Sequence, residues 1–472
     1  MSSRGILPFE VELVPRCDGT TGRAGLSLVL ETMRALQLDE AIQKHVRLRQ
    51  REAGYSEAEK VEALVLLLAA GGDCLDDIGV LQTDEGLLRL LGRSLPSADT
   101  LLGFLYQFHD EALIEAARKQ RPPDTVAYIP AENPALQGLA RVNTALVAAV
   151  AARGKGTRAT LDDDATVIES HKQQAEAHYK GGRGYQPALV YWAEQDLVVA
   201  DEFRDGNVPA GMGNLPRIQR AFASLPGSIR EYYFRADSAC YDERVLKWLA
   251  NPKRPDGPQG RIGFSISADM TEALRQICTA VPQQAWRLVD ERDDETVACA
   301  DVEFTPGDWP KDAEPLRYVA VRIKKRQGRL FASGFDTKYL AVVSNRDELQ
   351  APALLRWHWG KAGTIEHVHD VMKNELGAGV LPCSRFGANA AWYRLSALTY
   401  NVLSALKSLA LPAELSAARP KRLRFSVFNL AGRISQHAGR MWLRISEQVE
   451  RLAGLVKARM RLAALLPAAE SG

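Results

Sequence analysis

Glu366 and Lys373 are two side chains whose types and spacing could act on one phosphorylated ligand. They are seven residues apart, so on a helix they would stand two turns apart on one side, roughly 10 Å from each other. A carboxylate can bind a divalent metal ion, and an amine can bind a phosphate of the same ligand. A solvated charge pair on a surface helix has the same spacing, so the pair alone does not establish a site.

The segment that carries this pair is expected to be an amphipathic helix. Apolar residues recur at steps of three and four, which predicts one buried face. The residues of this face are Ile365, Val368, Met372 and Leu376. Asp370 joins Glu366 and Lys373 on the other face. His367 and His369 flank the glutamate, and with few zinc-type partners in the sequence we interpret them as positioning residues or plain surface.

Three consecutive Asp residues stand in Leu161–Ile168, a stretch with the alternating period of a strand. Asp162 and Asp164 fall on the polar face, whereas Asp163 falls on the apolar face. Because Asp is a poor strand former, something other than strand stability must favour these residues.

A further Asp, Asp237, ends another expected strand, Glu231–Asp237, at the edge where ligands gather in sheets of this kind. Together with Asp164 and Glu366 it could hold two divalent ions about 3.5–4 Å apart, which would clamp the attacking and leaving oxygens of a phosphoryl displacement. Oxygen ligands favour Mg²⁺ or Mn²⁺. The order of elements alone suggests that the three carboxylates converge.

The elements around these residues change character along the chain. The first 155 residues are expected to be helical, with one helix over Leu26–Leu38 and another over Ala58–Ala70 that Gly71 ends. Ser97 or Asp99 would cap a later helix. This region has some likeness to a helix-turn-helix, but an ordinary helical bundle explains it equally well.

Strands and helices alternate from Thr160 onward in the order β-β-β-α-β-α-β, which predicts a mixed sheet with helices packed on it. A β-rich insertion follows between about 269 and 345, with four expected strands near Trp286–Asp290, Val297–Phe304, Leu316–Arg326 and Tyr339–Val343. The long apolar segment Ala388–Leu411 is expected to be a central helix.

Composition places the chain among ordinary globular proteins. Hydrophobic residues make up 46% and charged residues 25% of the 472 residues, and the net charge is +2. The six cysteines are scattered without a C-x-x-C motif, so neither a zinc site nor a disulfide framework is indicated. The longest apolar run, Ala63–Ala70, is too short to span a bilayer. We therefore expect a soluble, cytoplasmic protein without a membrane partner.

Basic residues gather in two places. Lys324, Lys325 and Arg326 would form a basic hairpin tip, which is either a solvated edge or a DNA contact. Between Ala418 and Arg461, eleven Lys and Arg residues face only two Glu residues. Because aromatic residues are interleaved with them, this stripe favours a polyanion as the partner. Its DNA-contact candidates are Arg433, Arg440 and Arg444.

Several of these stretches together resemble the DDE transposases of bacterial insertion sequences, most closely the insertion sequence thirteen-eighty family. The stretches that carry the resemblance are Leu161–Thr166, His178–Pro187, Glu202–Asn207, Arg235–Ser238 and Ala362–Glu366. The resemblance covers nearly the whole chain. It implies an α/β fold, a ribonuclease-H-like mixed sheet with helices, interrupted by the β-rich insertion and preceded by a helical N-terminal domain.

The resemblance also divides the chain into expected domains. These are a helical DNA-binding domain (1–155), the first part of the catalytic core (156–268), the insertion (269–345), the second part of the core (346–412) and a basic C-terminal segment (413–472).

The resemblance assigns roles to the residues. The family motif Asp-x-Thr falls on Asp164–Thr166, so Asp164 is the first choice for the first carboxylate and Asp162 the reserve. Glu366 and Lys373 match the family motif Y-(2)-R-(3)-E-(6)-K, but Trp359 and Ala362 stand at its Tyr and Arg positions. Lys361 is a candidate for the missing cation.

The implied activity is cut-and-paste transposition. Asp164, Asp237 and Glu366 would hold two Mg²⁺ or Mn²⁺ ions, and Lys373 would contact a phosphate near the scissile bond. The partners would be terminal inverted repeats and target double-stranded DNA, bound by a homodimer in a synaptic complex. The protein would work at the nucleoid of a bacterial cell. A metal-dependent nuclease on the same fold and a non-catalytic DNA-binding protein derived from a transposase remain alternatives.

Overall fold

The computed structural model describes residues 3–4, 10–11, 19–48, 54–154, 156–307, 309, 315–326, 329–446 and 451–466. These residues form two compact units. The first comprises residues 1–109, 374–383 and 387–472, and the second comprises residues 110–373 and 384–386. Residues 110–155, which we expected in the N-terminal domain, thus group with the second unit. Positions 447–450 and 467–472 of the expected basic C-terminal segment lie outside the described residues.

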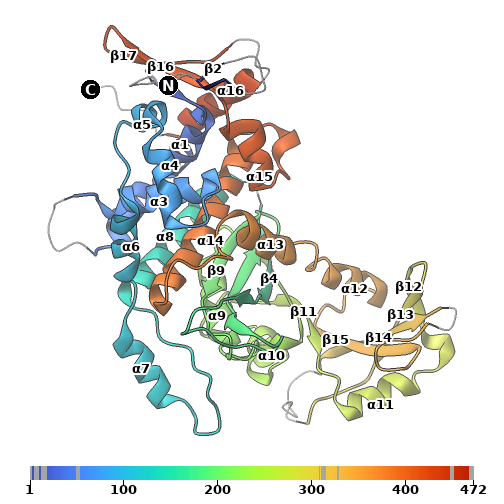
Figure 1. Cartoon of the computed structure of the whole chain (residues 1–472). Coiled ribbons are helices and arrows are strands. Elements are labelled where there is room, and N and C mark those ends of the chain that lie inside the picture. The colour runs from blue at the N-terminus through green and yellow to red at the C-terminus, as the bar shows by residue number, and fades with distance from the viewer. Residues whose placement is uncertain are drawn as a thin grey trace. The chain divides into compact units, whose positions relative to one another are not determined.

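The first unit is mainly helical (Figure 1). Its helices are α1 (Ser27–Ala35), α2 (Leu38–His45), α3 (Glu57–Ala70), α4 (Ile78–Gln82), α5 (Glu85–Leu91), α6 (Ala98–Tyr106), α14 (Phe386–Leu409), α15 (Pro420–Leu423) and α16 (Arg451–Ala463). A small antiparallel sheet has the order β17 (Arg440–Arg444), β16 (Gly432–His437), β3 (Thr20–Thr21), and β1 (Ser3–Arg4) pairs with β2 (Glu10–Val11). Helix α14 is buried on all sides from Gly387 to Leu406, as its apolar sequence predicted.

Local sequence signals explain where several of these helices begin and end. Ser56 caps α3 by accepting a hydrogen bond from the Glu59 amide, and Gly71 ends it in the left-handed conformation at φ 100°. Ser97, and not Asp99, caps α6. The expectation of one continuous helix over Leu26–Leu38 is wrong, because Gln37 adopts a left-handed φ of 56° and separates α1 from α2. No helix among those that the structure describes is long and apolar enough to cross a bilayer.

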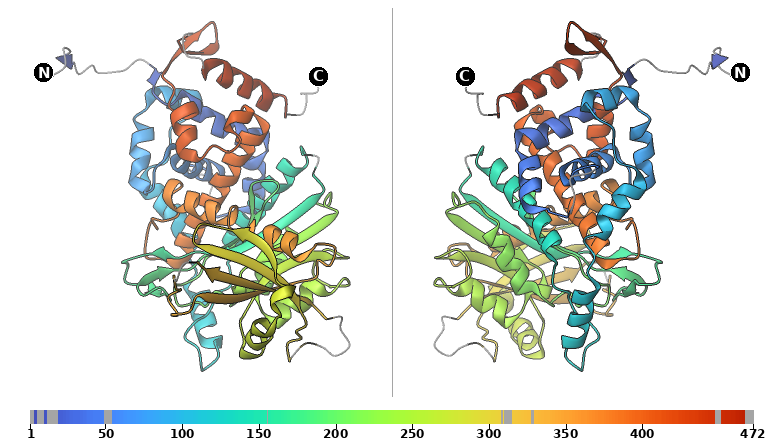
Figure 2. Two further views of the ribbon diagram at one scale, coloured as in Figure 1. Left: turned by 90° about the vertical axis from the view of Figure 1, so that its right-hand side faces the viewer. Right: turned by 90° about the vertical axis from the view of Figure 1, so that its left-hand side faces the viewer.

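The second unit is built on a nine-stranded mixed sheet, seen from two further sides in Figure 2. Its strands are β4 (Arg158–Ala165), β8 (Ala188–Trp192), β9 (Leu197–Glu202), β10 (Glu231–Ala236), β11 (Ile262–Ala268), β12 (Arg287–Glu291), β13 (Glu295–Val302), β14 (Arg317–Lys325) and β15 (Thr337–Ser344). The spatial order is β12-β13-β14-β15-β11-β10-β4-β8-β9. The predicted β-β-β-α-β-α-β succession is confirmed, with β10 parallel to β4 and β11 and with β8 antiparallel to β4 and β9.

Helices and a small sheet complete this unit. The helices are α7 (Glu111–Gln120), α8 (Pro134–Ala151), α9 (Asn214–Ala223), α10 (Glu243–Ala250), α11 (Glu272–Ala280), α12 (Ala351–Trp359) and α13 (Ile365–Glu375). The small sheet consists of β5 (Ile168–Glu169), β7 (Arg183–Tyr185) and β6 (Glu176–Ala177). Helix α13 forms where the sequence predicted it, with Ile365, Val368 and Met372 buried.

The four insertion strands form where we expected them, and they continue the main sheet. β15 pairs antiparallel with β11 over Ser265–Ala268, and β14, β13 and β12 follow outward. Helix α12 covers these strands through Leu354 and Leu355, which pack into one apolar cluster with Val319 and Val342. The insertion and the core therefore share one hydrogen-bonded sheet.

Candidate active site

Asp164 and Asp237 leave the sheet side by side. β4 and β10 run parallel with Asp163 opposite Ala236, so Asp164 and Asp237 are the next residues at the same edge. Asp164 is partly buried, and Asp237 is exposed. The Asp237 carboxylate also accepts a 3.1 Å hydrogen bond from the Ala239 amide, which fixes the turn after β10.

The environment of Asp164 disfavours its charge. Burial raises the pKa of Asp164 to about 6; the positive charge of Lys361 opposes this rise, and the negative charge of Asp237 adds to it. The Nζ atom of Lys361 lies 3.6 Å from Oδ1 of Asp164. A bound cation would reduce the electrostatic repulsion between the carboxylates of Asp164 and Asp237.

One face of helix α13 lies against the end of β4. The Nε2 atom of His369 is 4.0 Å from Oδ2 of Asp164, and the Nζ atom of Lys373 donates a 3.0 Å hydrogen bond to Oγ1 of Thr166. Glu366 is exposed and precedes His369 by three residues and Lys373 by seven, so it lies on the same face of the helix. The structure thus brings the helix of Glu366 to the sheet edge of Asp164.

Asp162 has a structural role, because its carboxylate is hydrogen-bonded to neighbouring elements of the fold. Its carboxylate is fully buried and accepts hydrogen bonds from Arg235 at 2.7 and 2.8 Å and from the Thr364 hydroxyl at 2.5 Å. Arg235 also donates to the carbonyl of Trp357 on α12 at 2.6 Å. Because these partners occupy both oxygens of Asp162, the arrangement favours Asp164 as the carboxylate that faces a ligand.

Asp163 points to the opposite face of the sheet, as its place in the strand pattern predicted. Its carboxylate forms a buried ion pair with Arg217 of α9, at 2.8 Å and 3.0 Å, and accepts a 3.0 Å contact from the thiol of Cys240. Burial acts to raise the pKa of Asp163, but Arg217 holds it below its usual value. Asn214 of α9 donates a 2.7 Å hydrogen bond to the carbonyl of Ala239. Helix α9 is thus bonded both to β4, through Arg217, and to the turn after Asp237.

The three adjacent Asp residues therefore have three different surroundings. Asp162 ties β4 to β10 and to the start of α13, Asp163 ties β4 to α9, and Asp164 faces the sheet edge. These separate interactions explain why three consecutive Asp residues occur in a strand, although Asp is a poor strand former.

The donors at this edge fit a hard divalent cation in their chemistry. Asp164, Asp237 and Glu366 offer carboxylate oxygens, the ligands that Mg²⁺ and Mn²⁺ prefer. Within the described ranges, the three do not form a group whose ligand atoms all lie within 4.8 Å of one another. The one group that meets this criterion there is Asp73, Cys74 and Asp77.

That acidic group is explained by the local backbone. Oδ2 of Asp77 accepts hydrogen bonds from the amides of Asp73 at 3.0 Å and Cys74 at 3.3 Å. The group thus caps a helical turn, and we assign it no metal.

The expected DNA contacts fall into two classes. At the tip of the insertion, acidic residues neutralise the cations: Lys325 pairs with Asp294 at 2.9 Å and with Glu295 at 2.8 Å, and Arg326 pairs with Glu291. Lys324 lies 4.0 Å from another carboxylate, that of Asp336.

On the β16–β17 hairpin the basic side chains are exposed. They are Arg433, Arg440 and Arg444. Lys361 is mostly buried beside Asp164, with 11% of its side chain exposed.

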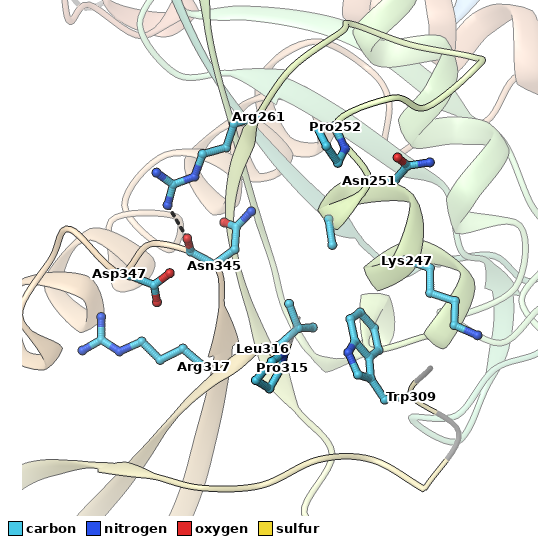
Figure 3. A pocket seen from close by; sticks show the side chains of 11 residues that line it. Lys247, Asn251, Pro252, Arg261, Trp309, Pro315, Leu316, Arg317, Asn345 and Asp347 are labelled. Atoms are coloured by element: carbon cyan, nitrogen blue, oxygen red, sulfur yellow. Dashed lines mark hydrogen bonds between the residues drawn. The ribbon is translucent and has the colours of Figure 1, made fainter. Parts of the chain in front are cut away.

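A pocket of about 710 Å³ is lined by the end of α10, the start of β14 and the residues that precede β11 and follow β15 (Figure 3). None of the predicted carboxylates lines it. Its cations have partners: Arg261 pairs with Glu348 at 2.9 Å, Arg317 with Asp301 at 2.7 Å, and Lys247 with Glu243. We therefore assign no catalytic role to this pocket.

Residue types and spacing did not single out Arg235 and Thr364 as parts of the site. Both stand within stretches that carry the family resemblance, Arg235–Ser238 and Ala362–Glu366. Each side chain is directed at Asp162, which is distant from both in sequence. His369 was considered only as a positioning or surface residue; the structure shows it buried against Asp164.

Comparison with known proteins identifies the family of the chain. The family profile described as "Transposase DDE domain group 1" matches residues 10–466. No curated protein matched the chain. Among solved structures, the piggyBac transposase synaptic complex with hairpin DNA is similar at 12% sequence identity and a TM-score of 0.43, over 93% of this chain and 86% of that chain.

Proposed function

Because the chain belongs to the DDE transposase family, we propose that it catalyses cut-and-paste transposition of the element that encodes it. It would cleave DNA at terminal inverted repeats and join the freed 3′-hydroxyl to target DNA. The observation that carries the proposal is the placement of Asp164 beside Asp237 at one sheet edge, with the Glu366 face of α13 against it.

Asp164, Asp237 and Glu366 would hold two Mg²⁺ or Mn²⁺ ions. Such ions, when bound, activate the attacking oxygen and stabilise the leaving oxygen of an in-line displacement. Glu366 lies in the first turn of α13 and is exposed, so it would complete the set from the helix side. Asp162 and Asp163 hold the strand that presents Asp164.

The proposed reaction consists of two phosphoryl-transfer steps, strand cleavage and strand transfer. In the first, water attacks the scissile phosphorus, the bond from phosphorus to the 3′ oxygen breaks, and the 3′ oxygen leaves as a hydroxyl. In the second, that hydroxyl attacks a phosphorus of target DNA, and the target's own 3′ oxygen leaves. Lys373, which Thr166 orients, would bind a non-bridging phosphate oxygen, and Lys361 would balance the negative charge of Asp164.

The β16–β17 hairpin would supply a DNA-binding surface. Arg433 lies directly opposite Arg444, and His437 lies opposite Arg440, with Trp442 between them on the same face. We call this set of five exposed side chains the basic hairpin face. Like charges placed opposite each other destabilise a strand pair, so the arrangement suits a polyanion better than it suits the sheet.

The finer assignments rest on the sequence motifs and on this topology. The core strand order β9-β8-β4-β10-β11, in which β8 is antiparallel to both of its neighbours, supports a ribonuclease-H-like core. The motif stretches support membership in the insertion sequence thirteen-eighty family and a bacterial, nucleoid-associated protein. Cutting two ends together would require a homodimer in a synaptic complex on DNA.

A cleavage assay tests this proposal. Labelled DNA that carries the end of the encoding element is incubated with Mg²⁺ or Mn²⁺ and with the wild type, Asp237→Ala or Glu366→Gln. Glu243→Gln, which changes an exposed carboxylate of α10, is the matched control. We expect metal-dependent nicking at the end by the wild type and the control, and none by the two site variants, although all four bind the DNA.

Other outcomes of this assay would contradict the proposal. Cleavage that survives both site substitutions would mean that the active site lies at other residues. End binding without cleavage by any form would favour a non-catalytic DNA-binding protein, and cleavage without strand transfer would favour a nuclease.

A further inference from the structure

We infer that His369 supplies a nitrogen ligand to the divalent ion held by Asp164, so that the site binds Mn²⁺ in preference to Mg²⁺. The inference rests on the proposed function, because it adds a ligand to the proposed metal site. It is carried by the geometry of the His369 ring.

The imidazole of His369 is buried without a hydrogen bond of standard geometry. Only 5% of the residue is exposed, and within the part of the chain that the structure describes neither Nδ1 nor Nε2 makes such a bond, although the backbone of Asp164 interacts with the ring. A buried polar atom without a partner is costly, so such an atom calls for an explanation. A neutral imidazole has a lone pair to offer to a metal ion.

His358 provides a contrast within the same unit. This histidine is also buried, but its Nδ1 lies 2.8 Å from the hydroxyl of Ser265 and its Nε2 lies 3.1 Å from the hydroxyl of Ser267. Both ring nitrogens of His358 thus have partners within the fold. The ring of His369 has a different setting, since its neighbour is the carboxylate of Asp164.

The separation of the donor atoms suits one shared ion. Nε2 of His369 lies 4.0 Å from Oδ2 of Asp164. Two ligand atoms that are each about 2.1–2.2 Å from an octahedral ion lie about 3.0 Å apart when adjacent and about 4.3 Å apart when opposite. An ion could therefore bind both atoms with little movement of either side chain. Lys361 pairs with the other carboxylate oxygen of Asp164, Oδ1, whereas Oδ2 is the oxygen near His369.

The position of His369 on α13 agrees with this role. It lies three residues after Glu366 and four residues before Lys373, so the three side chains follow one face of the helix. This face would present a carboxylate, an imidazole and an ammonium in succession to the metal and the phosphate.

A nitrogen ligand changes which metal the site prefers. Mg²⁺ prefers oxygen ligands, whereas imidazole suits first-row transition metals. We therefore expect the affinity for Mn²⁺ to depend on His369 much more than the affinity for Mg²⁺.

Spectroscopy of the bound metal provides the first test. The full-length protein is loaded with Mn²⁺ in the absence of DNA, and pulsed electron paramagnetic resonance is used to detect ¹⁴N coupled to the ion. We expect a histidine nitrogen coupling that changes when the protein is labelled with ¹⁵N-histidine. This experiment needs no variant. Mn²⁺ bound without any histidine nitrogen coupling would overturn the inference.

Calorimetric titration of variants provides the second test. His369→Gln should weaken Mn²⁺ binding by about tenfold and should change Mg²⁺ binding by less than about threefold. His367→Gln, at an exposed neighbouring position, should leave both affinities unchanged. Equal losses for both metals in a folded His369→Gln protein would assign the ring a purely structural role.

These results separate the inference from the proposed function. Metal-dependent end cleavage without nitrogen coupling would refute only the role of His369. Nitrogen coupling that disappears in His369→Gln, together with no cleavage by the wild type, would support the metal site and refute the transposase activity.

Discussion

The hydroxyl of Thr364 donates a 2.5 Å hydrogen bond to Oδ2 of Asp162, and this contact joins the residue before α13 to the middle of β4. Glu366 follows Thr364 by two residues, and Asp164 follows Asp162 by two. The contact therefore links the segment that carries Asp164 to the segment that carries Glu366.

Removal of this contact should impair cleavage while DNA binding persists. Thr364→Val keeps the shape of the side chain but cannot donate to Asp162. A small displacement of a catalytic group can cost a large factor in rate, so we expect about a tenfold loss of end cleavage. Thr364→Ser keeps the hydroxyl and should retain most of the activity. The measurement is cleavage rate beside end-binding affinity; a Val variant as fast as the wild type would show that the contact does not position Glu366.

Asp162 and Asp164 should respond in opposite ways to the same substitution. Asp162→Asn would leave the buried guanidinium of Arg235 without its anion, which we expect to cost about 3–5 kcal/mol of stability. Asp164 has a pKa raised by burial to about 6, above the value near 3.9 of an unfolded Asp. Its charge therefore opposes folding at pH 8, so Asp164→Asn should retain or raise the melting temperature and should abolish cleavage.

Thermal unfolding at pH 8 and the end-cleavage assay distinguish the two variants. A stable Asp162→Asn protein without activity, together with an active Asp164→Asn protein, would make Asp162 the catalytic residue.

Asp205 should make stability depend on pH. Burial raises the pKa of Asp205 to about 7; the negative charge of Glu176 adds to the rise and Arg118 opposes it. As the pH rises from about 4 to 7, the unfolded chain loses the proton while the folded chain retains it, so the fold loses stability. Asp205→Asn removes this loss and should stabilise the protein at pH 8 by on the order of 2 kcal/mol, with a smaller gain at pH 5.

The check is unfolding of the wild type and of Asp205→Asn at both pH values. Asp256→Asn, at an exposed position, serves as the control. The explanation fails if the gain from Asp205→Asn is the same at pH 5 and pH 8.

The basic hairpin face should contribute directly to the salt dependence of DNA binding. Each phosphate contact adds about 0.9 to the slope of log affinity against log salt concentration. Replacement of Arg433, Arg440 and Arg444 by Gln should therefore lower the slope by up to about 3. The matched triple variant of the insertion tip, Lys324, Lys325 and Arg326 to Gln, should change the slope less, because acidic neighbours already pair with these cations.

Affinities measured from about 50 to 200 mM salt test this contrast. A larger effect from the insertion tip than from the hairpin would place the DNA on the insertion.

Periodicity predicted most strands and helices of the second unit, because each element has its own pattern of apolar residues. The helix α13 and the four insertion strands, β12 to β15, formed where they were expected. The break at Gln37 was missed, since neither Gly nor Pro stands at this position and the left-handed φ belongs to a residue type that rarely adopts it.

The roles of the three Asp residues could not be predicted from their own segment. Their assignment depends on Arg217, Arg235 and Thr364, which lie 54, 73 and 202 residues away from their partners. The pairing of Lys325 with Asp294 likewise joins residues 31 positions apart. Sequence spacing shows which residues could act, but such distant partners decide which of them are free to act.

The shared sheet has a consequence for any shortened form of this protein. β11 is flanked by β10 on one side and by β15 on the other. Excision of residues 269–345 would remove β15 and leave β11 as an uncovered edge strand with a row of unpaired amides and carbonyls. Such edges recruit strands from other chains. A truncated core should therefore self-associate through β11. In the full chain the insertion prevents this, because β15 pairs with that edge.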